Sequence, residues 1–363
     1  MRADVSGTRR SRWAYADGDR AVRARATILL LAALLIVVAL FSLGWGASDA
    51  SALEVIAHWT GLGDGALSAR DRLIVETIRL PRVILGILIG AGLAVAGAIL
   101  QGLFRNPLAD PALIGVTAGA SLCAVFVIVL GGTVLAPMAG LLGIYSLPTA
   151  AFIGGLIASF ALYRIATRRG QTSVATMLLA GIALTAFASA VMGILIFVAS
   201  DAQLRDLVFW SLGSVAGATP TKVLATAPII LLALAATPFL ARSLNALALG
   251  EATASHLGIP VQRMKTIALI CVAALTGASV AVSGGIGFVG IVVPHLLRLV
   301  IGPDHRYLLP ASALLGGAFL IAADAVSRTV VAPAELPIGI VTALVGAPFF
   351  VWILLRRRGL LDL

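Results

Sequence analysis

Arg79-Leu-Pro-Arg82 opens the most informative stretch of this chain; a glycine-rich apolar run follows, and the stretch closes with Gln101-Gly-Leu-Phe-Arg-Asn-Pro-Leu-Ala-Asp-Pro111. The apolar run is long enough to cross a bilayer, which takes about 20 residues. It ends in a short polar turn, and a second apolar segment begins directly with Ala112-Leu-Ile-Gly115. We therefore predict two membrane spans joined by a tight hairpin. The turn supplies our structural or gating candidates, which are Arg105, Asn106, Pro107, Asp110 and Pro111.

The composition is that of an integral membrane protein. The chain has 363 residues, of which 60% are hydrophobic and 12% charged, and its mean hydropathy is +1.07. A soluble domain has roughly 45–50% apolar and about 25% charged residues. The net charge of +10 does not indicate nucleic-acid binding, because no surface of interleaved aromatic and basic residues accompanies it.

Apolar runs between charges and Pro or Gly breaks predict ten spans, and so an all-α fold. They lie near 26–45, 82–104, 112–131, 147–164, 174–199, 221–241, 264–283, 286–301, 308–328 and 338–355. The eighth is short and interrupted by glycines. We divide the chain into a basic tail (1–25), a ten-span domain (26–355) and a second tail (356–363).

The arginines orient these spans. The two tails carry Arg2, Arg9, Arg10, Arg12, Arg20, Arg23 and Arg25 at one end and Arg356, Arg357 and Arg358 at the other. If both tails are cytoplasmic, most remaining basic loop residues also lie inside, and the opposite loop at 132–146 has no charge. Because cytoplasmic loops are rich in Lys and Arg, we predict that both termini are cytoplasmic.

A cleavable signal peptide is the alternative for residues 1–50, because Ala47-Ser-Asp-Ala-Ser-Ala52 has the small residues that cleavage needs. The apolar run from Ala26 is longer than the hydrophobic part of a signal peptide, and a long basic tail precedes it. We therefore favour a retained first span.

Some basic residues fall on the outer side. Arg79, Arg82 and Arg328 each lie at a span end, where a long side chain can reach the membrane surface. They would then be anchors. The alternative is a basic rim that docks an acidic soluble partner by complementary charge. The residues alone do not separate these two interpretations.

Asp324 is the one carboxylate clearly inside a predicted span. An ionisable residue within the membrane is costly and is a candidate functional residue. Arg328 lies four positions further on, close enough on one helix face to pair with it. A proton-coupled carrier usually has more such groups, so a single paired Asp favours a structural role.

Motifs for chemistry are missing. The only lysines, Lys222 and Lys265, do not follow glycine, so the chain has no G-x-x-x-x-G-K-[ST] loop and any ATP must bind another subunit. Gly285-Ile-Gly-Phe-Val-Gly290 matches a dinucleotide pattern, but it lies among membrane segments, where glycines permit a break or close packing. The four histidines lack metal-ligand spacing. We expect no catalytic residue, metal site or cofactor on this chain.

The inside loop between spans six and seven, about 242–263, contains Leu247-Ala-Leu-Gly-Glu-Ala-Thr-Ala-Ser-His-Leu-Gly-Ile-Pro260. This segment is too mixed to span a membrane, and its glycines and Pro260 bound a short helical turn. Small residues on an exposed cytoplasmic helix indicate a surface that a partner covers. A helix lying on the bilayer is the alternative, but large apolar anchors are missing.

Four segments resemble the permease subunits of bacterial ABC importers for ferric siderophores, hemin and cobalamin. They are 79–120, Leu249-Gly-Glu to Leu257-Gly258, 284–309 with Gly-Phe-Val-Gly and Val-Pro-His-Leu-Leu-Arg, and Ala334-Glu-Leu-Pro-Ile-Gly339 running into Gly346-Ala-Pro-Phe-Phe350. Ten spans with both ends inside is also that family's architecture. Residues 201–214 look more like those of hemin permeases than of cobalamin permeases.

The resemblance implies a multi-pass transport subunit, not an enzyme, in the bacterial inner membrane. Two copies would form a homodimer in the lipid bilayer, two cytoplasmic ATPase subunits would bind ATP and Mg, and a periplasmic substrate-binding protein would cap the dimer. ATPase coupling is implied for Leu249, Gly250, Glu251, Ala254, Leu257 and Gly258, and binding-protein docking for Arg79, Arg82 and Arg328. We expect hemin as cargo, then a ferric siderophore, then cobalamin. A stand-alone secondary transporter that depends on Asp324 is the distant alternative.

Overall fold

The computed structural model describes residues 20–44, 68–112, 115–168, 171–332 and 334–356. Nearly all of them are helical, as predicted. Seven described helices are long and apolar enough to cross a membrane, and three described apolar helices are shorter. Together they account for the ten predicted spans.

The predicted spans correspond one to one to helices. The long ones are α1 (Ala21–Gly44), α4 (Leu80–Leu103), α7 (Ser146–Ala166), α8 (Val174–Val198), α10 (Pro220–Ala248), α12 (Val261–Ser283) and α14 (His305–Thr329). The shorter ones are α5 (Val116–Leu130), α13 (Val289–Ile301) and α15 (Ile338–Arg356).

Several small elements join or extend these spans. Before α4 come α3 (Ala69–Leu73) and the π-helical η1 (Ile74–Arg79); α6 (Ala136–Leu142), η2 (Gly143–Tyr145), α9 (Asp201–Ser211), α11 (Glu251–His256) and the antiparallel hairpin of β1 (Thr167–Arg168) and β2 (Gln171–Thr172) follow. Of these, our sequence analysis predicted only α11.

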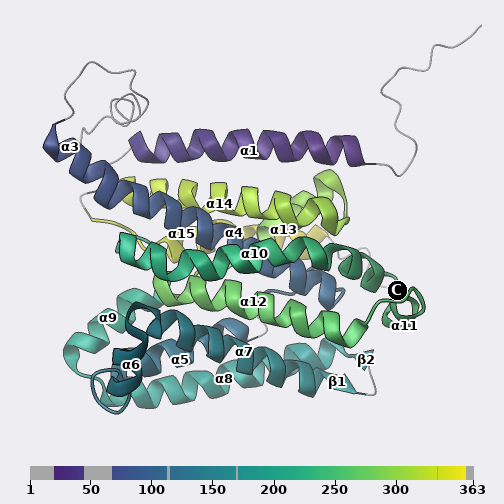
Figure 1. The fold of residues 1–363 in the computed structure, drawn as a ribbon, viewed down its shortest axis with the longest axis horizontal. Helices are drawn as coiled ribbons and strands as arrows, with labels where there is room; N and C mark the ends of the chain where they lie inside the picture. The colour runs from purple at the N-terminus through teal and green to yellow at the C-terminus, as the bar shows by residue number, and fades with distance from the viewer. Residues whose placement is uncertain (1–19, 45–67, 113–114, 169–170, 333, 357–363) are drawn as a thin grey trace, which may run out of the picture.

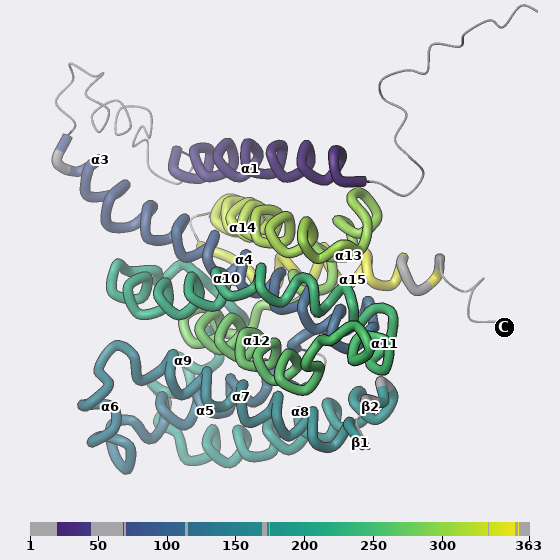
Figure 2. The backbone as a smooth tube through the Cα atoms, turned by 45° about the vertical axis from the view of Figure 1, so that its right-hand side comes forward, coloured from purple at the N-terminus to yellow at the C-terminus, as the bar shows by residue number. Residues whose placement is uncertain are grey.

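The helices form one bundle with two ends (Figure 1). The start of α1, the β1–β2 hairpin and α11 lie at the right-hand end, while α3, α6 and α9 lie at the left-hand end. The same grouping is visible in Figure 2 after the rotation. We call the first the inner end and the second the outer end, because the start of α1, which carries Arg23 and Arg25, lies at the inner one.

α4 is the central helix of the bundle. Every residue from Leu88 to Leu103 is buried, and α14, α12, α10 and α13 all pack against it. Small residues make this possible: a Cβ on Gly90 would overlap the backbone of Gly316 on α14, and a Cβ on Gly97 would overlap Gly290 on α13. Close backbone approach through glycine is typical of membrane helices.

The chain breaks its helical path between α12 and α13. Gly284 (φ +70°) and Phe288 (φ +68°) both adopt positive φ, and the four residues from Gly284 to Gly287 are not helical. Ser214 donates its backbone N–H to the carbonyl of Ser283 at 2.7 Å, so other parts of the chain surround the break. Non-helical backbone at membrane depth is tolerated only in such an enclosed position. The predicted interruption of the eighth span is confirmed.

The first predicted span is helix α1, and it packs along α14 (Figure 1). Its buried residues include Ala24, Leu31 and Leu43. Packing of this kind is what a retained first span requires.

Candidate functional site

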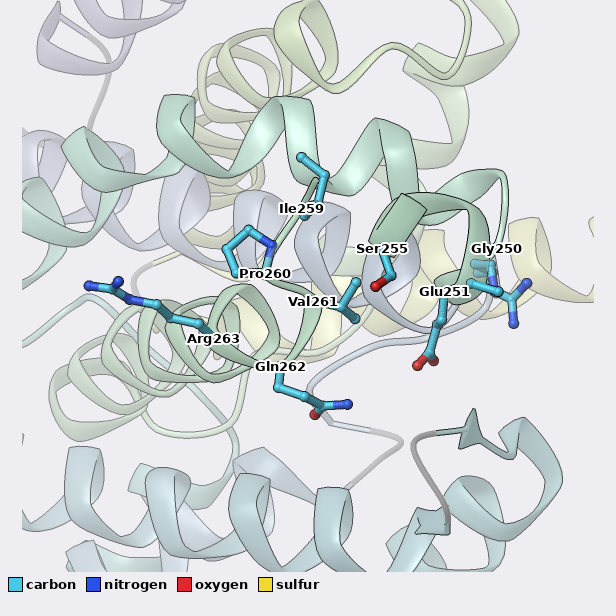
Figure 3. Close-up of a pocket in the computed structure, with 10 residues that line it drawn as sticks. Gly250, Glu251, Ser255, Ile259, Pro260, Val261, Gln262 and Arg263 are labelled. Carbon is cyan, nitrogen blue, oxygen red and sulfur yellow. The ribbon is translucent and has the colours of Figure 1, made fainter. Parts of the chain in front are cut away.

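A cavity of about 930 Å³ lies at the inner end, next to α11 (Figure 3). It is lined by Arg105, Gly250, Glu251, Ala252, Ser255, Ile259, Pro260, Val261, Gln262 and Arg263. The hairpin turn after α4 and the loop between α10 and α12 therefore meet at one place. The sequence analysis singled out both segments but did not predict that they adjoin.

Local sequence explains why α11 is short. Gly250 precedes it with φ +110°, and Gly258 follows its end with φ +80°; an L side chain at either position would be strained. Ala254 faces the bundle and is fully buried, whereas Leu249 and Leu257 are 67% and 62% exposed. Ala254 thus faces inward, and two large apolar residues face outward beside the cavity.

The turn after α4 is held by its own polar side chains. Asn106 Oδ1 accepts a hydrogen bond from the backbone N–H of Leu108 at 3.0 Å, and Asp110 Oδ1 accepts one from that of Ala112 at 2.8 Å. Asx turns of this kind fix a tight reversal. Arg105 itself has φ +50°, a conformation uncommon outside glycine. Pro107 and Pro111 complete this turn. Whether any of these five residues gates transport stays a prediction.

Lys265 and Glu251 form an ion pair beside the cavity that the sequence analysis missed. Lys265 Nζ lies 2.7 Å from Glu251 Oε1, and the lysine side chain is only 1% exposed. The sequence analysis considered Lys265 only in the search for a nucleotide-binding loop. No local spacing pairs it with Glu251, since the two residues lie on different helices.

A second group of charged side chains lies at the outer end. We call it the outer ionic cluster, and it consists of Arg82, Asp324, Arg328 and Glu335. Arg82 donates from Nε to both oxygens of Asp324 at 3.0 Å, and Arg82 Nη2 lies 2.9 Å from Glu335 Oε2. Arg328 Nε lies 3.2 Å from Asp324 Oδ2. The predicted pairing of Asp324 with Arg328 is confirmed, and Arg82 adds a stronger one from α4.

The three outer arginines are buried, at 4% (Arg79), 6% (Arg82) and 8% (Arg328) exposure. Arg79 Nη1 donates to the carbonyl of Leu43 at 2.8 Å, and Arg328 Nη2 donates to Ser42 Oγ at 2.8 Å. Side chains buried in this way neither reach toward the membrane surface as anchors nor form an exposed basic rim, so a docking partner would have to displace their present contacts. Arg79 and Arg328 bind the end of α1, and Arg82 joins α4 to Asp324 of α14.

Two of the three described histidines have local structural partners. The His295 ring packs edge-on against Phe349 at 6.1 Å between centroids. His305 Nδ1 lies 2.8 Å from Asn245 Oδ1. These contacts join neighbouring helices, and they place the two imidazoles in separate environments.

Fold and site together define a multi-span membrane subunit whose inner end presents an exposed helix beside a cavity. Residues 34–356 match the FecCD transport family, and the chain belongs to this family. Two similar relatives and one similar solved structure are transport proteins. The chain is thus a permease of the ABC-importer type in the cytoplasmic membrane, as the sequence resemblance implied.

The individual relatives carry different cargoes. The chain is 44% identical over 332 residues to the hemin transport system permease of Yersinia pestis, covering 91% of this chain and 96% of that protein. It is 46% identical over 287 residues to the cobalamin import permease of Halobacterium salinarum, covering 79% of this chain and 74% of that protein. An inward-facing metal-chelate type ABC transporter superposes with a TM-score of 0.77 at 30% identity, covering 92% of this chain and 99% of that one.

Proposed function

We propose that this chain is the membrane subunit through which an ATP-driven importer moves hemin from the periplasm into the cytoplasm. The observation that carries the ATP-driven part is α11 at the inner end. Its flanking residues Leu249 and Leu257 are exposed next to a cavity of about 930 Å³. Exposed apolar residues around a concave surface are typical of a protein interface, so this is where an ATPase subunit would bind.

The proposed assembly contains two copies of this chain, two ATPase subunits and one periplasmic substrate-binding protein. ATP and Mg would bind the ATPases. The inner coupling residues are Leu249, Gly250, Glu251, Ala254, Leu257 and Gly258. The outer end would receive the binding protein at Arg79, Arg82 and Arg328.

Docking at the outer end would involve exchange of ionic partners. Arg82 is already bound to Asp324 and to Glu335, and Glu335 is the more exposed of the two carboxylates, at 39% against 3%. The outer ionic cluster has two arginines and two carboxylates, so its charges balance. Acidic residues of the binding protein would compete with Glu335, the more exposed carboxylate, for Arg82.

Hemin is proposed as cargo on two grounds. The hemin permease of Yersinia pestis matches over nearly its full length, and residues 201–214 resemble hemin permeases. A ferric siderophore or cobalamin is the alternative cargo, since a cobalamin permease has a similar sequence identity to this chain over a shorter region.

A secondary carrier is disfavoured by the state of Asp324. This carboxylate contacts two guanidinium groups, from Arg82 and Arg328. Both oxygens of this carboxylate are engaged by these groups, which favours a structural role over proton transfer.

Uptake by proteoliposomes tests the function directly. Vesicles would contain this chain, its ATPase subunit and the binding protein, and would be offered hemin, a ferric siderophore or cobalamin. We expect uptake of hemin that requires ATP and stops when the ATPase is omitted. Uptake without ATP would support the secondary carrier, and ATP-dependent uptake of cobalamin or siderophore alone would keep the permease but discard hemin.

A further inference from the structure

Lys265 is the largest fully buried side chain of the described residues, and it carries a charge. It lies near the start of α12, one helix beyond α11. Burial of an unpaired ammonium group is costly, and a partner must offset that cost. Glu251, the first residue of α11, is this partner, at 2.7 Å between Nζ and Oε1. The pair therefore joins the exposed helix to a membrane span.

A third helix meets the same ammonium group. Lys265 Nζ lies 5.6 Å from the centroid of the Tyr163 ring on α7, within the range of a cation–π interaction. The Tyr163 hydroxyl also donates to Gln262 Oε1 in the first turn of α12. Figure 3 shows the carboxylate of Glu251 and the amide of Gln262 on the same side of the cavity. Elements α7, α11 and α12 thus converge on Lys265.

The helix α11 has few routes by which to act on the bundle. It has six residues, too few to be stable without tertiary contacts. Ala254 is its only buried residue, and Glu251 is its ionic contact with the interior. An Ala methyl group makes weak, non-directional contacts, whereas a largely buried ion pair is strong and directional. Besides the short chain connection through residues 257–260, the Glu251–Lys265 ion pair is therefore a direct contact through which a displacement of α11 can act on α12.

We propose that the Glu251–Lys265 ion pair transmits movement of α11 to α12 and, through Tyr163, to α7. Lys265 is then a positioning residue for transport that lies outside the loop to which coupling was assigned. This inference rests on the proposed function, because it requires that an ATPase moves α11. Glu251 Oε2 is buried and has no hydrogen-bond partner among the described residues, so Oε1 is the oxygen through which this carboxylate holds Lys265.

A purely structural pair is the competing explanation, and a double substitution separates the two. Glu251→Gln with Lys265→Met removes both charges at similar side-chain size, so that no unpaired charge remains buried. Such neutral replacements are often tolerated for stability. If the pair only stabilises the fold, the double variant should transport like the wild type. If the pair transmits movement, it should assemble but transport poorly.

The experiment measures cargo uptake and ATP hydrolysis in the same proteoliposomes, using hemin as the probe. For the double variant we expect wild-type amounts of assembled complex and about a tenfold loss of hemin taken up per ATP hydrolysed, a typical coupling effect. Lys222→Met is the matched control, because Lys222 is the only other lysine and lies at the start of α10, outside both sites. Its uptake per ATP should be unchanged.

A second variant covers the case in which the neutral pair does not assemble. Glu251→Lys with Lys265→Glu exchanges the charges and keeps an ion pair, and we expect it to retain more uptake per ATP than either single substitution. Wild-type coupling in the assembled neutral variant, or an exchanged pair no better than the single substitutions, would overturn the proposal. Failure of the wild-type chain to bind any ATPase would instead overturn the proposed function.

Discussion

The outer and inner ends of this permease both bury charged side chains, but they do so differently. At the outer end, Arg82 is bound by two carboxylates, and Asp324 is bound by two arginines. At the inner end a single pair, Glu251–Lys265, lies beside a cavity, and one of its carboxylate oxygens has no hydrogen-bond partner among the described residues. Multiple mutual contacts fix a geometry, whereas an incompletely bonded pair can change it. The difference suggests a rigid outer end and a movable inner end.

The largest effect is expected from Asp324→Asn. This change leaves Arg82 and Arg328 buried with less compensation, which typically costs about 3–5 kcal/mol. Thermal unfolding of the purified protein in detergent measures the loss. Glu76→Gln is the matched control, because the Arg72–Glu76 pair is exposed at the same end and such pairs contribute about 0–1 kcal/mol. Equal stability of the two variants would contradict the conclusion that the outer ionic cluster makes the outer end rigid.

A smaller and more local effect is expected from Gly250→Ala. Its φ of +110° strains any L side chain, at a cost of about 1–3 kcal/mol. The strain should loosen α11 without melting the spans, because α11 lies outside them. We therefore expect weaker ATPase binding at an unchanged unfolding temperature. Gly140→Ala serves as control, since no atom lies near its added Cβ. A global fall in stability would show that the inner end is as rigid as the outer one.

Tighter binding of the periplasmic binding protein is expected from Glu335→Gln at the outer end. The change removes the exposed competitor for Arg82 and makes the outer ionic cluster more positive. Binding of the periplasmic binding protein to nanodisc-embedded permease should tighten about two- to fivefold, the range of a partly exposed ion pair. The gain should shrink at high salt, which screens exposed charges. Unchanged or weaker binding at low salt would contradict docking at this cluster.

The smallest effect concerns Asp304, in the turn before α14. Partial burial opposes its ionisation, but hydrogen bonds from Arg306 and Asn245 outweigh this and lower its pKa to about 2. The folded protein therefore prefers the ionised form, and its contribution to stability is present above about pH 4 and is lost as the pH falls toward 2. The difference in unfolding temperature between wild type and Asp304→Asn should shrink over this window. A constant difference would mean that ionisation of Asp304 adds nothing.

The spans could be predicted from sequence because bilayer thickness sets their length. The pairing of Asp324 with Arg328 was equally accessible, since four residues separate them on one helix face. One missed element also had a local signal: Ser200 and Gln203 form a capping box at the start of α9, a pattern that marks a helix N-terminus.

The long-range ionic contacts could not be predicted in this way. Arg82 and Asp324 are 242 residues apart, and no pattern in the sequence around either residue indicates the other as its partner. The same holds for Lys265 and Tyr163. Hydrophobic periodicity locates helices, but it does not determine which polar side chains meet where helices cross. The burial of the outer arginines was missed for this reason.

The residues of the outer ionic cluster are far apart in the sequence, and this has a consequence for biosynthesis. Arg82 is synthesised long before Asp324, and Ser42 is 286 residues ahead of its partner Arg328. Through most of translation, Arg82 therefore lacks its carboxylate partners Asp324 and Glu335. The cluster forms only when α14 inserts, so it acts as a late assembly step. Chains truncated before α14 should consequently be recognised and degraded by membrane quality control, even though their early spans are complete.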